Sequence, residues 1–129
     1  MMSGPQSAPT ILIVEDEPSI RTILQRMLER AGYELIVAKN GDEALALAND
    51  HTGATDLLVT DVTMLGMNGF ELGGYIGGIH PETSVLFVSG YAEDSSPVRK
   101  GLRTAGQAFL LKPFTRDALL GKVKEILDS

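Results

Sequence analysis

Side chains able to bind a metal ion or a phosphate recur at one kind of position in this sequence, at or just after the end of a short apolar run. They are Glu15 and Asp16, Asp61, Ser89 and Lys112. Three carboxylates held close together repel one another, and each is driven towards protonation unless a cation lies among them. Mg²⁺ prefers oxygen ligands, takes few of them from the protein and keeps several waters. The three acidic residues are therefore candidate Mg²⁺ ligands, provided that the fold brings them together.

Lys112 and Ser89 suit a phosphoryl group. Lys112 offers a mobile point charge that could pair with Asp61 or bind a phosphoryl oxygen, and Ser89 offers a hydroxyl donor to the same oxygens. A carboxylate is a modest nucleophile, but phosphoryl transfer depends mainly on positioning and on neutralising charge. We therefore predict that Asp61 attacks phosphorus and forms an acyl phosphate.

The elements that must position these side chains alternate along the chain. Apolar, β-branched runs predict buried strands at 11–14, 33–38, 57–61, 85–88 and 108–111. Apolar stripes at helical spacing predict helices from Pro18 to 31, from a cap at Asn40 or Asp42 to 49, from a cap at Asn68 to 79, and from a cap at Thr115 to 127. A fifth helix, short or irregular, is expected at 94–104. This alternation predicts an α/β protein with a doubly wound, five-stranded parallel sheet and five helices, in which ligands bind at the carboxyl ends of the strands.

The third predicted helix contains an unusual number of glycines. Four of them lie between positions 73 and 78, and each costs about 1 kcal/mol relative to alanine in a helix interior. Their spacing matches a membrane helix-dimer motif, but the segment is too short and polar for that interpretation. We predict a weak surface helix.

Composition excludes several classes of protein. A chain of 129 residues is one domain by length, with 1–9 expected to form a flexible tail or linker remnant and 10–129 the folded domain. There is no cysteine, so thiolate metal sites and disulfides are excluded. The net charge of −6 argues against sequence-independent nucleic-acid binding. No apolar run is long enough for a membrane span, and the start has no secretory signal, so a cytoplasmic location is predicted.

Four segments resemble the response-regulator receiver (phosphoacceptor) domains of two-component signalling, which have a flavodoxin-like fold. They are ILIVEDEP at 11–18, TDVTMLGMNG at 60–69, VSGY at 88–91 and FLLKPF at 109–114. The resemblance covers 10–129, and the four segments in this order and at this spacing are specific to that family.

The resemblance implies a role for each candidate residue. Asp61 would be the phosphoacceptor, Asp16 a direct Mg²⁺ ligand and Glu15 a ligand through water. Thr63 would supply a backbone carbonyl to the metal, and Lys112 would bind the phosphate.

Further implications concern switching and loop structure. Ser89 and Phe109 lie where the family has its switch hydroxyl and switch aromatic, and a cis Lys112–Pro113 peptide is expected. The family usually has proline at the position of Leu65, and we expect the substitution to loosen the loop without removing a ligand.

The resemblance also implies partners. A histidine kinase or a histidine phosphotransfer protein would donate its phosphoryl group to Asp61, in a reaction for which this chain supplies the catalytic groups while acting as a signalling switch. The segments after Ser89 and around Lys112 are similar to receivers at the C-terminus of hybrid sensor histidine kinases. We expect no direct nucleic-acid binding, no membrane insertion, and a monomer or weak dimer.

Two alternative functions differ from this one in the residues that they require. Phosphatases of the haloacid dehalogenase type need a second aspartate two residues after the nucleophile, where this chain has Thr63. A pseudo-receiver that binds partners without being phosphorylated remains open, although such a chain would normally lack Asp61 or Lys112. His51 and His80 have no ligand partners in the pattern and are predicted to be solvated.

Overall fold

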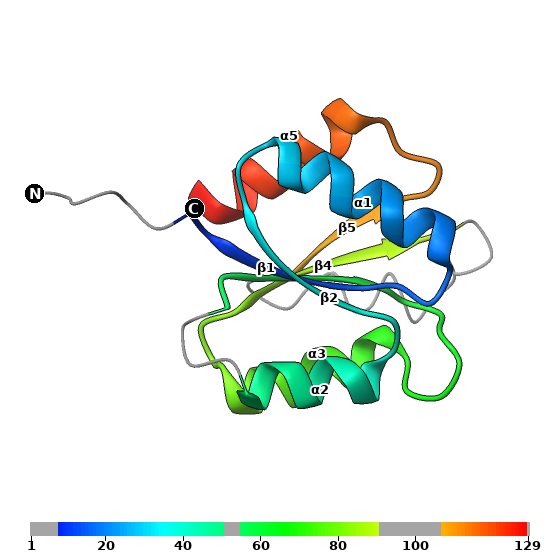
Figure 1. Cartoon of the computed structure of the whole chain (residues 1–129), viewed down its shortest axis with the longest axis vertical. Helices are drawn as coiled ribbons and strands as arrows, with labels where there is room; N and C mark the ends of the chain where they lie inside the picture. Colours follow the sequence, from blue (N-terminus) through cyan, green and yellow to red (C-terminus); the bar gives the residue numbers. More distant parts are fainter. Residues whose placement is uncertain (1–7, 51–54, 91–106, 129) are drawn as a thin grey trace, which may run out of the picture.

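The computed structural model describes residues 8–50, 55–90 and 107–128. Five parallel strands form one sheet in the order β2-β1-β3-β4-β5. The strands are β1 (Thr10–Val14), β2 (Glu34–Ala38), β3 (Leu57–Asp61), β4 (Ser84–Ser89) and β5 (Gln107–Leu111). The described helices are α1 (Pro18–Arg30), α2 (Gly41–Asp50), α3 (Gly69–Ile79) and α5 (Arg116–Asp128). Helices α1 and α5 cover one face of the sheet and α2 and α3 the other (Figure 1), so the predicted doubly wound sheet is confirmed.

Four of the five predicted helices lie within the described residues. The fifth, expected at 94–104, lies outside them, as does His51. Of the helices that are described, none combines the length and the apolar character that crossing a bilayer requires.

The core forms two layers because neighbouring residues of a strand point to opposite faces of the sheet. On β1, Ile11 and Ile13 pack in the layer beneath α1 and α5, whereas Leu12 and Val14 pack in the layer beneath α2 and α3. All four are fully buried. This burial on both faces explains why the central strands are continuously apolar and not alternating.

Several predicted helix ends are confirmed. Pro18 occupies the first turn of α1, and Gly32, with φ of 99°, follows its last residues. The Asn40 side chain, and not that of Asp42, accepts the Glu43 backbone N–H at the start of α2. At the start of α3, Asn68 and Glu71 form the reciprocal capping box.

The four glycines between positions 73 and 78 of α3 fall into two groups. Gly74, Gly77 and Gly78 face open space, as expected for a surface helix. Gly73 instead is buried, and a Cβ atom placed there would lie 3.5 Å from the ring of Phe87. The helix forms despite its composition because its capping box and its apolar face outweigh the low helix propensity of glycine.

The prediction that His80 is solvated is wrong. Its ring Nε2 lies 3.1 Å from the carbonyl oxygen of Ala48, and the residue is half-buried. This contact joins the end of α3 to the last turn of α2, where carbonyl groups lack partners within the helix.

Candidate functional site

The candidate site lies where the direction of winding of the sheet reverses. Strands β1 and β3 are neighbours, and Val14 pairs with Thr60 in their register. The next residues, Glu15 and Asp61, therefore reach the carboxyl edge of the sheet side by side. In α/β sheets of this order, the crevice between these two strands is the usual ligand site.

The structure brings the three predicted acidic residues together. One carboxylate oxygen each from Glu15, Asp16 and Asp61 can be chosen so that all three lie within 4.8 Å of one another. Glu15 is 1% exposed and Asp61 is 6% exposed. A cluster of oxygen donors at this spacing, with two members shielded from water, fits a small divalent cation such as Mg²⁺.

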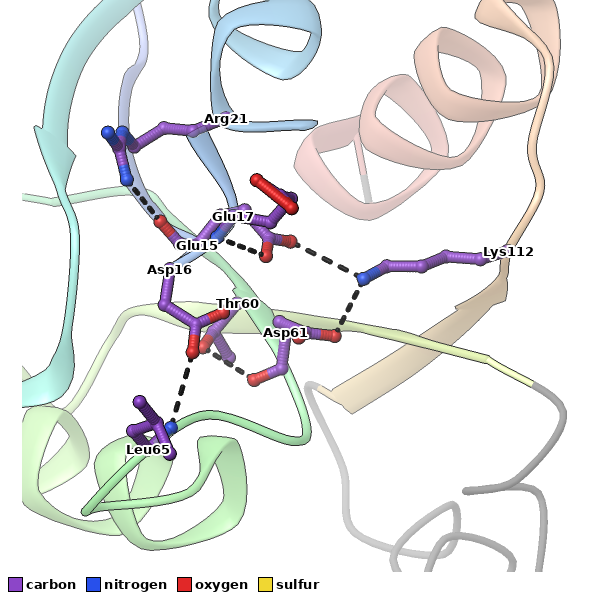
Figure 2. A network of polar contacts seen from close by, with 8 residues as sticks. All are labelled: Glu15, Asp16, Glu17, Arg21, Thr60, Asp61, Leu65 and Lys112. Carbon is purple, nitrogen blue, oxygen red and sulfur yellow. Dashed lines mark hydrogen bonds and ion pairs between the residues drawn. The ribbon is translucent and has the colours of Figure 1, made fainter. Parts of the chain in front are cut away.

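Lys112 reaches this cluster from the end of β5 (Figure 2). Its Nζ lies 3.0 Å from Asp61 Oδ1 and 3.5 Å from Glu15 Oε1. Burial alone would lower the pKa of the ammonium, but the hydrogen bond and charge of Asp61, and then those of Glu15, outweigh it and raise the pKa. Lys112 therefore stays charged at neutral pH. The peptide between Lys112 and Pro113 is cis, as predicted.

Glu15 has a raised pKa. Burial is the main cause, and the nearby charge of Asp61 adds to it. The Glu17 backbone N–H, 3.1 Å from Oε2, and the ammonium of Lys112 act in the opposite direction without cancelling the effect. Burial and the charge of Asp61 therefore both disfavour the ionised form of Glu15, and a cation bound between the two carboxylates would offset both effects.

The raised pKa of Glu15 gives a testable pH dependence. Because the pKa of Glu15 is raised on folding, the folded state holds a proton that the unfolded state loses as pH rises above the ordinary value of 4.5. Without divalent cations, the free energy of unfolding should therefore fall across this pH window. In the Glu15→Gln variant the free energy of unfolding should fall less, so the variant should become more stable relative to the wild type as pH rises.

Urea unfolding in EDTA at several pH values measures this difference. The exposed Glu125, which pairs with Lys122, supplies the control variant Glu125→Gln, whose profile should follow the wild type. If the free energy of unfolding changed with pH in the same way in the wild type and in Glu15→Gln, burial would not disfavour the ionised form of Glu15.

Two further contacts hold the acidic residues in place (Figure 2). The Arg21 guanidinium donates to the Glu15 carbonyl oxygen at 2.9 Å, and the Leu65 backbone N–H donates to Asp16 Oδ2 at 3.2 Å. Proline has no N–H, so the residue usual at this position in the family could not make the second bond. The Leu65 side chain itself is 87% exposed.

Gly69 is a site residue whose importance the sequence pattern did not reveal. A Cβ atom at this position would overlap the carbonyl oxygen of Asp61 and lie 3.0 Å from Val62 Cα. The Gly69 N–H also donates to the Val62 carbonyl at 2.9 Å. The Asn-Gly pair at the predicted start of the third helix was the available signal, but it indicates a turn equally well.

The predicted switch residues lie on adjacent strands. Ser89 is fully buried, and its Oγ has no hydrogen-bond partner in the described part of the chain. The ring of Phe109 packs 5.1 Å from that of Phe87 and 6.1 Å from that of Phe70, measured between centroids. Thr63 lies two residues after Asp61 with its side chain exposed, and the metal ligation by its carbonyl stays a prediction.

Comparison with known proteins identifies the class of this fold and site. Residues 11–124 match the family model of the response regulator receiver domain. The chain therefore belongs to the response-regulator receiver family, as its motifs predicted.

Individual relatives are of two kinds. The sensor kinase CckA of Brucella abortus is 40% identical over 119 residues, which are 92% of this chain and 12% of CckA. The alkaline phosphatase synthesis transcriptional regulatory protein PhoP of Bacillus subtilis is 36% identical over 117 residues, 91% of this chain and 48% of PhoP. The chain thus spans less than half the length of either relative.

Solved structures agree with the fold. The receiver domain from the hybrid histidine kinase CckA has a TM-score of 0.77 and 35% identity, covering 92% of this chain and 98% of that domain. The chemotaxis protein CheY4 of Vibrio cholerae has a TM-score of 0.80 and 31% identity, covering 93% of this chain and 99% of CheY4.

Proposed function

We propose that this receiver domain accepts a phosphoryl group on Asp61 from a phosphohistidine of a partner protein. The observation that carries the proposal is the position of the Lys112 ammonium, 3.0 Å from Asp61 Oδ1, beside the acidic cluster. A nucleophilic carboxylate, a fixed cation and a set of candidate metal ligands are the parts that phosphoryl transfer needs.

The proposed step is an in-line displacement at phosphorus. A carboxylate oxygen of Asp61 forms the new O–P bond while the P–N bond to the donor imidazole breaks. The imidazole nitrogen keeps the electron pair of that bond. With a proton on its other ring nitrogen, the imidazole leaves as a neutral molecule. Lys112 then pairs with a phosphoryl oxygen in place of the carboxylate oxygen that it contacts in the unmodified protein.

Glu15, Asp16, Asp61 and the Thr63 carbonyl are the residues proposed to hold Mg²⁺. When bound, the ion would neutralise charge that develops on the phosphoryl oxygens. The protein's contribution is to hold the acidic residues, of which Glu15 and Asp61 are buried. The Arg21 guanidinium binds the Glu15 main-chain carbonyl, and the Leu65 N–H binds the Asp16 carboxylate.

Phosphorylation is proposed to act through Ser89 on the surface around β4, residues 94–104 and β5. The hydroxyl would donate to a phosphoryl oxygen, and the Phe109 ring would move into the space that it leaves. The buried Ser89 Oγ supports this role, because a hydroxyl without a partner among the described residues gains a hydrogen bond when such an acceptor arrives.

The Ser89→Ala variant separates acceptance from response. It should take up a phosphoryl group at a rate within about tenfold of the wild type, because the nucleophile and Lys112 are untouched. The change in the NMR resonances of Phe109 on phosphorylation should be largely lost. A full response in Ser89→Ala would exclude this coupling, whereas Ser89→Thr should retain it.

The partner is proposed to be a histidine kinase or a histidine phosphotransfer protein. An open groove of about 330 Å³ runs beside Lys112 and is lined by Ile20, Ile23, Lys112, Pro113 and Phe114. Because Lys112 lines both the groove and the acceptor site, this apolar surface is proposed to contact the protein that delivers a phosphoryl group to Asp61. The similarity to CckA favours a hybrid kinase system.

The direct test is incubation with phosphoramidate and Mg²⁺ followed by intact mass spectrometry. One phosphoryl mass should be gained, and EDTA should slow the gain by at least about tenfold, since the ion neutralises transition-state charge. A pseudo-receiver would show no gain under either condition. Equal rates with and without Mg²⁺ would exclude the proposed metal requirement.

A further inference from the structure

Away from Asp61, a second groove lies between side chains of α1 and α5. These two helices cover the same face of the sheet (Figure 1). It has a volume of about 320 Å³ and is lined by Ile23, Arg26, Met27, Arg30 and Arg116. We call it the arginine groove. Three guanidinium groups in one small groove are unexpected in a chain whose net charge is −6.

These arginines have no acidic partners in the described part of the chain. The ion pairs there belong to Lys112, Lys122 and Lys124, and none of the three arginines has a side-chain hydrogen bond to another described residue. Guanidinium groups without an acidic partner among the described residues can bind an anion from solution.

The positions of the arginines have mixed effects on stability, because Arg30 alone lies in the last turn of a helix, where the dipole favours a cation. Arg26 and Arg30 are four residues apart on α1, where like charges cost a few tenths of a kcal/mol, on the order of 0.2–0.5. Arg116 is the first residue of α5, where the helix dipole presents its positive end. A bound anion would offset both the repulsion between Arg26 and Arg30 and the unfavourable position of Arg116 at the helix N-terminus.

The size of the groove indicates a small ligand. Residues 23 to 30 of α1 extend over only about 10 Å of helix axis, and a stable protein interface needs roughly 800 Å² from each partner. The volume of about 320 Å³ lies within the range of small-molecule sites. Ile23, which is 46% exposed, and the half-buried Met27 add apolar surface between the charges.

We propose that the arginine groove binds a nucleoside polyphosphate. Guanidinium groups bind phosphate oxygens through paired hydrogen bonds, and Ile23 and Met27 provide a surface for the nucleoside. The site is separate from the phosphoacceptor cluster, whose carboxylates repel a polyanion when no divalent cation is present.

The test is isothermal titration calorimetry of the whole chain in EDTA, which keeps nucleotides from binding the acidic cluster through Mg²⁺. The probes are ATP, GTP and inorganic tripolyphosphate. At least one nucleotide should bind with a Kd below about 1 mM, and it should bind several-fold more tightly than tripolyphosphate because only the nucleotide contacts Ile23 and Met27. Arg26→Gln, Arg30→Gln and Arg116→Gln should each weaken binding roughly tenfold.

Lys124→Gln supplies the matched control, because it removes one positive charge from an exposed position on α5 outside the groove. It should change the affinity less than about twofold.

Absence of binding by all three probes at about 10 mM, as expected if the groove serves only an acidic protein, would overturn the proposal. If Lys124→Gln weakened binding as much as the groove variants, the assignment of the site to the groove would be overturned. If tripolyphosphate bound as tightly as the nucleotides, the assignment of the ligand as a nucleoside polyphosphate would be overturned. Uptake from phosphoramidate should be normal in all four variants, so this result is independent of the phosphoacceptor proposal.

Discussion

The Asp61→Asn variant is expected to gain no phosphoryl group from phosphoramidate and Mg²⁺, which is a reduction in rate of at least about 10³-fold. The reason is chemical, since a neutral amide cannot form the acyl phosphate that the carboxylate forms. The change conserves size at a position that is 6% exposed, and it removes a negative charge beside Glu15. The fold should therefore be retained, and intact mass spectrometry with a circular dichroism spectrum measures both outcomes.

Asp50→Asn is a suitable control for this variant. Asp50 is exposed at the end of α2, and its replacement should leave uptake at the wild-type rate. A phosphoryl gain that persists in Asp61→Asn would place the acceptor on another residue, and the carboxylates of Glu15 and Asp16 would then be the first to test.

The second large effect is expected for Gly69→Ala. The added methyl group would overlap the Asp61 carbonyl oxygen and press against Val62 Cα, and both are backbone atoms that cannot move aside by rotating a side chain. Such overpacking costs about 1–3 kcal/mol of stability. Because it displaces the residue that carries the nucleophile, the rate of phosphoryl uptake should also fall, by up to about 10²-fold for a shift near 1 Å.

Gly74→Ala is the matched control within the same helix. A Cβ atom at Gly74 meets nothing within 4 Å, so this variant should be more stable than the wild type by up to about 1 kcal/mol and should be phosphorylated normally. Urea unfolding and initial rates measure the contrast. Equal stability of Gly69→Ala and the wild type would show that α3 can move away from Asp61 at little cost.

The strands and most helix ends could be predicted because they depend on local chemistry. Continuous β-branched runs specify buried strands. Asn68 and Glu71 satisfy backbone groups within one turn of their own positions, and Pro18 lacks the N–H that would have no partner in the first turn of α1. The acidic cluster could be predicted for a different reason. In a parallel sheet all carboxyl ends lie at one edge, so residues far apart in sequence converge without any knowledge of side-chain contacts.

What could not be predicted depends on how elements pack together. The bond from the Leu65 N–H to Asp16 joins two loops 49 residues apart, and nothing in either loop indicates the other. His80 was misjudged because the carbonyl that it contacts belongs to a different helix. The arginine groove exists only because α1 and α5 lie side by side, so Arg116 looks unrelated to Arg26 and Arg30 in the sequence.

The turn at Gly32 has a practical consequence for building sensors from this domain. Helix α1 begins beside Glu15 and ends at Arg30, so the turn that follows lies at the edge of the sheet remote from Asp61. Ala31 and Gly32 are both exposed, and open space surrounds Gly32. Exposed turns of this kind tolerate insertion of foreign sequence. A fluorescent reporter inserted between these two residues would leave the phosphoacceptor edge and the groove beside Lys112 accessible to partners.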